Sequence, residues 1–304
     1  MRFTSLLALL VAAVFAVGAD AALILRYKLD EASGAPQALD SGPLGANANN
    51  TGENGRQPGP FSGSTAYTFA DNDQTVEAGH IDQLGGFSKA TVMYWVNFNG
   101  RDPHADFGQT DRAVLDYSRP QIQPSNGDVI FQANQSNLGR RFSLFMSNPS
   151  GSPAFYDRGL DIQDLFNVGT LNTQTLDDWH LVALTFDNSN IGIRVRSYFD
   201  GIERTTLGTD PPVGFVMRSA VGGNTNLSVG NIRLTVSPPS LPVAESLSGI
   251  SDIRVYNETL SGADILAVYD SADNKIVTIP EPGCAMLAVI GLAGLANCGW
   301  RRKR

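Results

Sequence analysis

The chain has 304 residues, of which 22 are Lys or Arg and 30 are Asp or Glu, so its formal net charge is −8. Charged residues make up only 17% of the chain, and 31 glycines and 16 prolines are present. This composition favours a loop-rich all-β protein over a helical bundle or a coiled coil. The acidic balance also argues against a nucleic-acid partner, because phosphate binding requires a cluster of basic residues.

Residues 1–21 predict a secretory signal peptide. Arg2 supplies a positive charge ahead of an unbroken apolar run over residues 6–17, and residues 19–21 (Ala-Asp-Ala) fit the small-x-small pattern of a cleavage site. The apolar run is shorter than the roughly 20 residues needed to span a bilayer, which argues against a permanent anchor. We therefore expect an exported protein whose mature chain begins at Ala22.

From residue 22 to about residue 277, short strand-like runs alternate with turn residues. The run over residues 91–98 is apolar at almost every position, as expected of a strand that is buried on both faces. Further strands are predicted at residues 23–29, 128–132, 141–146, 181–186 and 253–256. Many short strands separated by turns indicate a β-sandwich or a β-barrel.

Three local features interrupt this pattern of strands. Residues 193–199 alternate between apolar and polar positions, and the Asp-Gly pair at residues 200–201 then predicts a tight hairpin turn. Residues 47–63 are dense in Gly, Pro and Asn and predict a surface loop. A short helix is predicted over residues 261–269, because it begins with a serine that can cap it and an aspartate three residues later that can bond back.

The C-terminal segment, residues 278–304, combines three elements in a fixed order. Pro280, Glu281 and Pro282 precede an apolar stretch over residues 283–300, which approaches the length of a membrane-spanning helix. The chain then closes on four basic residues, Arg301, Arg302, Lys303 and Arg304. Such a basic cluster stays on the cytoplasmic side of a membrane.

This arrangement of the tail resembles the bacterial PEP-CTERM sorting signal. The resemblance implies processing at the Pro-Glu-Pro element by an exosortase-type membrane enzyme, in a Gram-negative-type envelope. It also implies delivery to the cell surface or to an extracellular matrix. We expect contact with the membrane only through the tail, as a transmembrane helix, before that processing.

Several stretches between residues 22 and 272 resemble, in the correct order, the laminin-G-like (LamG) jelly roll of the concanavalin A-like lectin/glucanase superfamily. The matching stretches are residues 25–31 with 40–42, 87–96, 179–187 with 198–201, and 249–257 with 260–261. The segment between residues 100 and 178 matches weakly. The resemblance implies an all-β, LamG-like jelly-roll sandwich over residues 22–277, between the signal peptide and the sorting tail.

Glycoside hydrolysis is the first activity to consider, because some members of this superfamily cleave β-glucans. Retaining glycosidases place two carboxyl groups about 5–5.5 Å apart, and the hydrolytic relatives carry theirs as Glu-x-Asp-x-x-Glu on one strand. That motif is absent, and no two glutamates lie within five residues of each other. His80 and His104 lack an obvious nucleophilic partner, and His180 is expected to be an edge residue at a strand entrance. We therefore expect no enzyme activity, although an active site assembled from distant loops remains open.

The resemblance also implies a structural calcium ion, since many relatives bind one. The first and last strands lie near each other in this fold, so Asp30, Asp40 and Asp252 could converge at one rim and supply the oxygen ligands that calcium prefers. The alternative is that these three acids end strands and form turns.

Aromatic side chains are the remaining candidates for a sugar site, because their faces stack on pyranose rings. Trp95 and Trp179 occupy positions that the resemblance places in the core, which leaves Tyr117, Phe155 and Tyr156 of the weakly matching segment. We expect a binding protein that recognises a polysaccharide or another envelope component. A structural or adhesive matrix protein without affinity for glycans is the main alternative, and a hydrolase is the third.

Overall fold

The computed structural model of the protein describes residues 22–51, 55–69, 74–97, 112–118, 129–136, 141–147, 155–161, 178–219, 225–230 and 249–271. These residues belong to one compact unit that runs from Ala22 to Lys275. The signal peptide and the sorting tail lie outside the described residues and stay predictions. Among the described residues, no helix is both long enough and apolar enough to cross a membrane.

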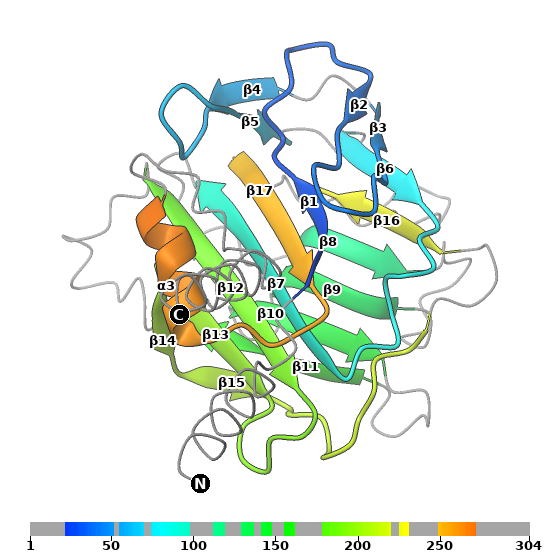
Figure 1. Cartoon of the computed structure of the whole chain (residues 1–304), viewed down its shortest axis with the longest axis vertical. Coiled ribbons are helices and arrows are strands. Elements are labelled where there is room, and N and C mark those ends of the chain that lie inside the picture. Colours follow the sequence, from blue (N-terminus) through cyan, green and yellow to red (C-terminus); the bar gives the residue numbers. More distant parts are fainter. Residues whose placement is uncertain are drawn as a thin grey trace, which may run out of the picture. The chain divides into compact units, whose positions relative to one another are not determined.

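Two antiparallel sheets form this unit (Figure 1). The eight-stranded sheet has the order β14 (Ile202–Arg204), β13 (Val195–Phe199), β12 (Trp179–Asp187), β7 (Lys89–Asn97), β17 (Gly249–Tyr256), β5 (Thr65–Thr68) and β4 (Gly55–Pro58), with β1 (Leu23–Tyr27) also paired to β17. The nine-stranded sheet has the order β15 (Thr206–Gly208), β11 (Phe155–Asp161), β10 (Arg141–Ser147), β9 (Val129–Ser136), β8 (Arg112–Ser118), β16 (Asn226–Val229), β6 (Thr75–Gly79), β3 (Ala48–Thr51) and β2 (Gln37–Ala38). The all-β prediction is confirmed.

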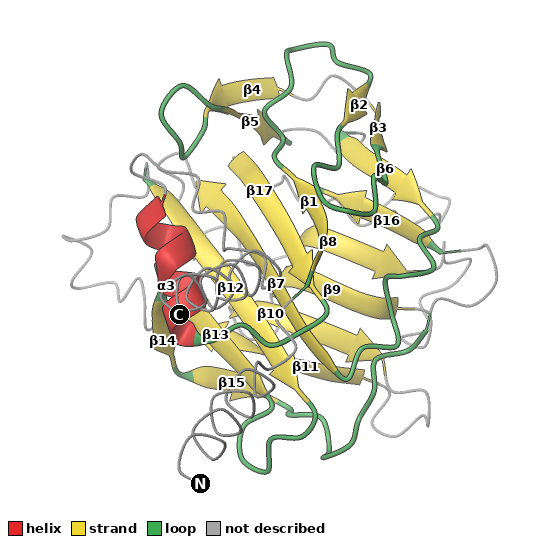
Figure 2. Cartoon of the chain, viewed as in Figure 1, coloured by secondary structure: helices red, strands yellow, loops and turns green. Residues whose placement is uncertain are grey.

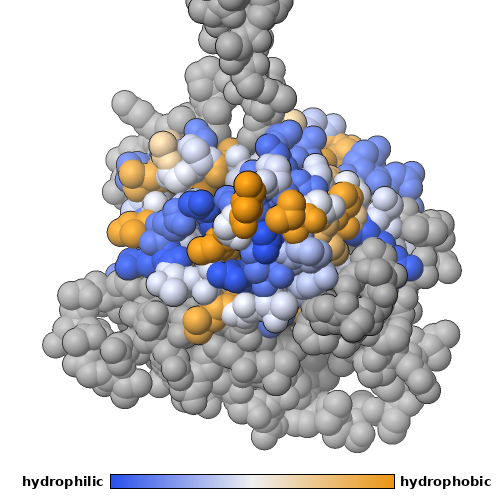
Figure 3. Space-filling model, turned by 90° about the horizontal axis from the view of Figure 1, so that it is seen from below, coloured by the Kyte–Doolittle hydropathy of each residue, from blue (hydrophilic) through white to orange (hydrophobic). Residues whose placement is uncertain are grey.

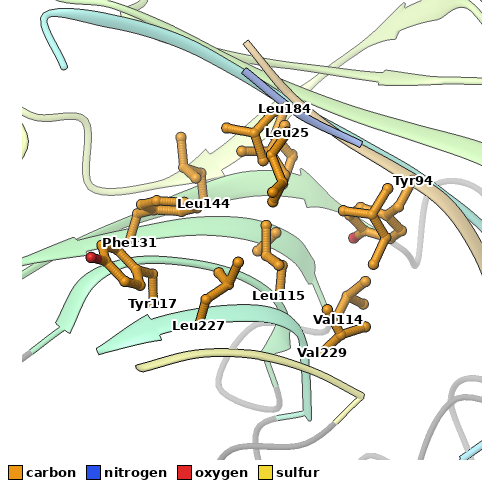
Figure 4. Close-up of a cluster of buried hydrophobic side chains, with 14 of the residues drawn as sticks. Leu25, Tyr94, Val114, Leu115, Tyr117, Phe131, Leu144, Leu184, Leu227 and Val229 are labelled. Carbon is orange, nitrogen blue, oxygen red and sulfur yellow. The ribbon is translucent and has the colours of Figure 1, made fainter. Parts of the chain in front are cut away.

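The main core fills the space between the two sheets. On β7, Val92, Tyr94 and Val96 belong to this core, as the alternation of side chains along a strand requires. Figure 4 shows side chains of the eight-stranded sheet facing those of the nine-stranded sheet, with Leu25, Tyr94 and Leu184 on one side and Val114, Leu115, Tyr117, Phe131, Leu144, Leu227 and Val229 on the other. Burying this apolar surface is the main driving force for closing the sandwich.

A second apolar layer lies on the opposite face of the eight-stranded sheet, under the helix α3 (Gly262–Asp270) (Figure 2). Ile265 and Val268 of α3 are buried, and so are Met93 and Trp95, which alternate with the core residues of β7. Strand β7 is therefore buried on both faces, as its sequence predicts. The predicted helix is also confirmed, since Ser261 caps it and forms a capping box with Asp264.

The structure confirms the predicted hairpin turn at residues 200–201, but only part of the surface loop predicted over residues 47–63. Asp200 and Gly201 both have positive φ, 52° and 76°, and connect β13 to β14 as predicted. The surface loop predicted over residues 47–63 is wrong in part, because β3 and β4 lie within it. β3 pairs with β6 in the nine-stranded sheet, and β4 pairs with β5 in the eight-stranded sheet, so pairing with a neighbouring strand overrides the weak strand propensity of Asn, Gly and Pro.

Candidate functional site

The hairpin between β4 and β5 forms an open hollow of about 700 Å³, which we call the hairpin hollow. It is lined by residues 56–65, which contribute an aromatic ring from Phe61 and polar groups from Arg56, Gln57 and Ser62. Because this one hairpin lines it, the hollow is open to solvent and offers a surface to one side of a ligand rather than an enclosing cleft. An aromatic ring beside a few polar groups is the combination that ligand sites use to bind and orient a molecule.

The loop of this hairpin is held in one conformation by its own hydrogen bonds. The hydroxyl of Ser64 donates to the backbone carbonyl of Phe61 over 2.8 Å and accepts from its N–H over 3.0 Å. The backbone N–H of Gly59 donates to the carbonyl of Ser64 over 2.9 Å. A loop fixed in this way loses little conformational entropy when a ligand binds.

Aromatic side chains continue from the hairpin hollow across the sheet beneath it. The ring of Phe61 packs edge-on against Trp95 of β7 with 5.9 Å between centroids, and Tyr269 of α3 stacks on Trp95 at 5.8 Å. The indole N–H of Trp179 donates to the carbonyl of Pro58 over 3.0 Å. Phe61, Trp179 and Tyr269 are only partly buried, so aromatic surface remains accessible beside the hairpin.

Arg56 places a positive charge in the wall of the hairpin hollow. Its guanidinium lies 3.5 Å from the ring centroid of Tyr67, and its Nε donates to the carbonyl of Glu31 over 3.0 Å. A cation over an aromatic face is stabilised by the ring quadrupole. These two contacts fix the position of the Arg56 side chain, which therefore supports the hairpin and also places a positive charge beside the hollow.

The structure corrects the ranking of the candidate aromatic residues. Tyr117 and Tyr156 are buried in the main core and cannot stack on a sugar, and the side chain of Phe155 lies outside the described residues. Trp95 is buried as expected, at 2% exposure, but beneath α3 rather than between the sheets. Trp179, expected in the core, is partly exposed because it is the first residue of β12 and lies against the hairpin.

The three acids predicted to bind calcium are only partly brought together. Both Asp40 and Asp252 contact Arg26: the Arg26 backbone N–H donates to Asp40 over 2.9 Å, and its Nε donates to Asp252 over 2.6 Å. Asp252 is 1% exposed, and Arg254 lies 2.5 Å from its other carboxylate oxygen. Asp30 is exposed, and its backbone carbonyl accepts a hydrogen bond from Thr65.

This arrangement does not fit a calcium ion. The two oxygens of Asp252 face two guanidinium groups, which already neutralise its charge. The oxygens of Asp40 accept from the backbone N–H groups of Arg26, Gly42 and Ala46. Within the described part of the chain, no three His, Cys, Asp or Glu side chains are close enough to hold a metal. Calcium binding therefore stays a prediction that rests on the resemblance alone.

The buried Asp252 carboxylate predicts a loss of stability in acid. Burial on its own raises the pKa of Asp252, but the guanidinium groups of Arg254 and Arg26 together bring it below its ordinary value. A depressed pKa stabilises the folded state above the unfolded pKa of about 3.9, and this contribution is lost as the pH falls through the folded pKa. We expect the Tm of the protein to fall more steeply below about pH 4 than that of Asp252→Asn. If the Tm values of the protein and of Asp252→Asn depend on pH in the same way, this explanation is contradicted.

Two histidines have partners that the sequence analysis missed. His80 contacts the hydroxyl of Thr225 through Nδ1 and lies 2.7 Å from Asp82 through Nε2. His180 is buried rather than at an edge, since its ring stacks on Phe199 and its Nδ1 is 2.9 Å from Asp200. Strand pairing brings His80 near Thr225 and His180 near Asp200, whereas Asp82 lies only two residues from His80 in the sequence.

Comparisons with known proteins identify the fold. The receptor-binding domain of botulinum neurotoxin C/D mosaic serotype has a TM-score of 0.54 and 12% identity, covering 82% of this chain and 51% of that one. The ligand-binding domain of botulinum neurotoxin serotype D, in complex with N-acetylneuraminic acid, gives the same four values. The binding domain of Paraclostridial mosquitocidal protein 1 has a TM-score of 0.54 and 10% identity, covering 82% and 52%. The protein therefore spans about half the length of each of these three similar structures.

A laminin-G family model, described as the concanavalin A-like lectin/glucanases superfamily, matches residues 70–266. No curated protein matches the sequence. The match includes the central strands β7 and β12 and the closing strand β17. Since it covers more than half of the chain, this protein belongs to the concanavalin A-like lectin/glucanases superfamily.

Proposed function

We propose that this protein binds carbohydrate, without catalysis, at the hairpin hollow. The observation that carries the proposal is the partly exposed aromatic pair Phe61 and Trp179 beside a fixed hollow of about 700 Å³. Aromatic faces pack against the apolar faces of sugar rings, and an exposed polar side chain of the hollow, that of Ser62, can bond a sugar hydroxyl. The complex of a similar fold with N-acetylneuraminic acid supports a glycan as the ligand class.

We also propose that the protein acts outside the cytoplasm. The apolar run before residue 22 supports export, and the Pro-Glu-Pro element, apolar stretch and basic end of residues 280–304 support sorting to the cell surface or matrix. A binding module displayed there would meet polysaccharides of the envelope or of its surroundings. An exosortase-type enzyme would be the processing partner.

Substitution of Phe61 tests the location of the site. We expect Phe61→Ala to weaken binding of a responsive polysaccharide about 30-fold, because an anchoring aromatic residue contributes on the order of 2 kcal/mol. Affinity electrophoresis or calorimetry on a panel of bacterial and plant polysaccharides measures the change. The Tm of the variant should fall, because the Phe61 ring packs on Trp95, so binding is measured at a temperature at which the variant is fully folded.

Phe145→Ala is the matched control for this substitution. Phe145 is also a partly exposed aromatic residue, but it lies on β10, where it alternates with the core residues Phe142, Leu144 and Met146. It therefore lies on the outer face of the nine-stranded sheet. Loss of binding in Phe145→Ala, with binding retained in Phe61→Ala, would contradict the hairpin hollow as the site.

A further inference from the structure

Two neighbouring loops carry exposed aliphatic side chains, and we call them the apolar loop pair. The first loop, residues 188–194, joins β12 to β13, and the second, residues 209–217, follows β15. Their exposed side chains are Ile191 at 89%, Ile193 at 46%, Val213 at 59% and Val216 at 44%. Figure 3 shows apolar side chains gathered among polar ones on the face that is at the bottom of Figure 1, where the β12–β13 loop lies.

An ion pair between Arg194 and Asp210 holds the two loops together. Arg194 Nη2 lies 2.9 Å from Asp210 Oδ2, and the same carboxylate accepts from the backbone N–H groups of Arg194 and Val195. Arg194 also donates to the carbonyls of Pro211 and Asn190, one on each loop. Both side chains are largely buried, with 14% and 11% exposure, so the link is shielded from solvent.

Further contacts fix the second loop against the first loop and the core. The backbone N–H of Gly214 donates to the carbonyl of Asn188 over 3.0 Å. Phe215, between the exposed valines, points inward and packs edge-on against Tyr156 at 5.0 Å and Phe186 at 5.9 Å. These contacts hold the second loop in place, so its exposed aliphatic side chains project from a rigid backbone.

The chemistry of the apolar loop pair suits a lipid surface better than a protein. The only charged side chains of the two loops, Arg194 and Asp210, pair with each other and are largely buried, so insertion would bring no unpaired charge into lipid. The N–H groups of Gly192, Gly214 and Phe215 are already bonded within the loop pair, which lowers the cost of moving them into lipid. Four aliphatic side chains cover less than the roughly 800 Å² per partner of a stable protein interface. The exposed tips also lack the Trp, Tyr and Arg that anchor such interfaces.

We propose that the apolar loop pair inserts into the surface of an uncharged, zwitterionic lipid bilayer. Isolated exposed aliphatic residues are common, but four of them on two adjacent loops with a rigid support indicate an interaction site. The net charge of −8 disfavours an anionic membrane, which is why the proposal commits to zwitterionic lipid. This inference does not depend on the hairpin hollow or on its ligand.

Hydrogen exchange of the full-length chain tests the proposal, because it reports each segment separately and so distinguishes the loops from the apolar C-terminal stretch. With phosphatidylcholine vesicles, we expect amide exchange in residues 188–193 and 213–217 to slow by about threefold or more. The double variant Ile191→Ser, Val213→Ser should lose this protection. Ile202→Ser, which changes an exposed aliphatic residue on the edge strand β14, should keep it.

Three outcomes would overturn the proposal. The first is exchange in the two loops that vesicles leave unchanged. The second is equal protection in the parent and the double variant, which would attribute the effect to another segment. The third is protection that appears without vesicles and grows with protein concentration, which would assign the surface to a second copy of the chain.

Discussion

Replacing Asp252 by Asn is expected to lower the free energy of unfolding by about 3–5 kcal/mol, because it leaves two arginine side chains without their carboxylate. Asp252 is 1% exposed, and the side chains of Arg26 and Arg254 that it contacts are 21% and 10% exposed. Urea unfolding with unchanged m-values measures the loss. We expect a value at the lower end of the range, since the Arg26 guanidinium can reach water.

Asparagine is the replacement that isolates the charge. Asp252 has φ of 45° at the irregularity in the β17–β7 pairing, and Asn tolerates this left-handed conformation as Asp does. Asp30→Asn is the matched control, because Asp30 is exposed and should change stability by less than about 0.5 kcal/mol. Adding Arg254→Met to Asp252→Asn should recover part of the loss, since it removes the buried charge. An Asp252→Asn variant as stable as the control would contradict the ion-pair account.

Replacing Trp95 by Ala is expected to cost about 3–5 kcal/mol of stability, because it removes a large side chain from a packed layer. Trp95 is 2% exposed and lies between Phe61 of the hairpin and Tyr269 of α3. Its loss should therefore loosen both elements at once. Thermal unfolding measures the total cost, and hydrogen exchange in α3 shows whether the helix loses protection.

Trp95→Phe separates packing from hydrogen bonding. The indole N–H of Trp95 is buried and has no hydrogen-bond partner among the described residues, so removing it costs no bond. Trp95→Phe should therefore lose much less stability than Trp95→Ala. A Trp95→Ala protein that is stable and has lost only ligand binding would show that Trp95 belongs to the site rather than to the packing.

The strand pattern predicts most of the fold because apolar and polar residues alternate clearly where one face is buried. The run over residues 91–98 predicts a strand buried on both faces, and β7 confirms it. The hairpin at Asp200 and Gly201 is predicted because only a few residue types adopt positive φ readily. β4 is not predicted, since the pairing with β5 that orders it depends on residues outside the local pattern.

The candidate sites are predicted less well, because the partners of a side chain come from distant strands. The resemblance implies that the first and last strands are neighbours, and β1 does pair with β17. The alternation of apolar residues with Arg26 and Arg254 in these strands is the signal that could have indicated arginine partners for Asp252. The hairpin hollow carries no local signal, because Trp179 reaches Pro58 across 121 positions of the chain.

The most direct test of the central claim incubates the purified protein with a polysaccharide panel and measures bound protein and new reducing ends in the same samples. Our account predicts saturable binding to at least one polysaccharide, weakened about 30-fold in Phe61→Ala, with no reducing ends above the protein-free control. Reducing ends that increase with time would show an enzyme. Absence of binding to every polysaccharide would contradict the proposed function and leave a structural matrix protein.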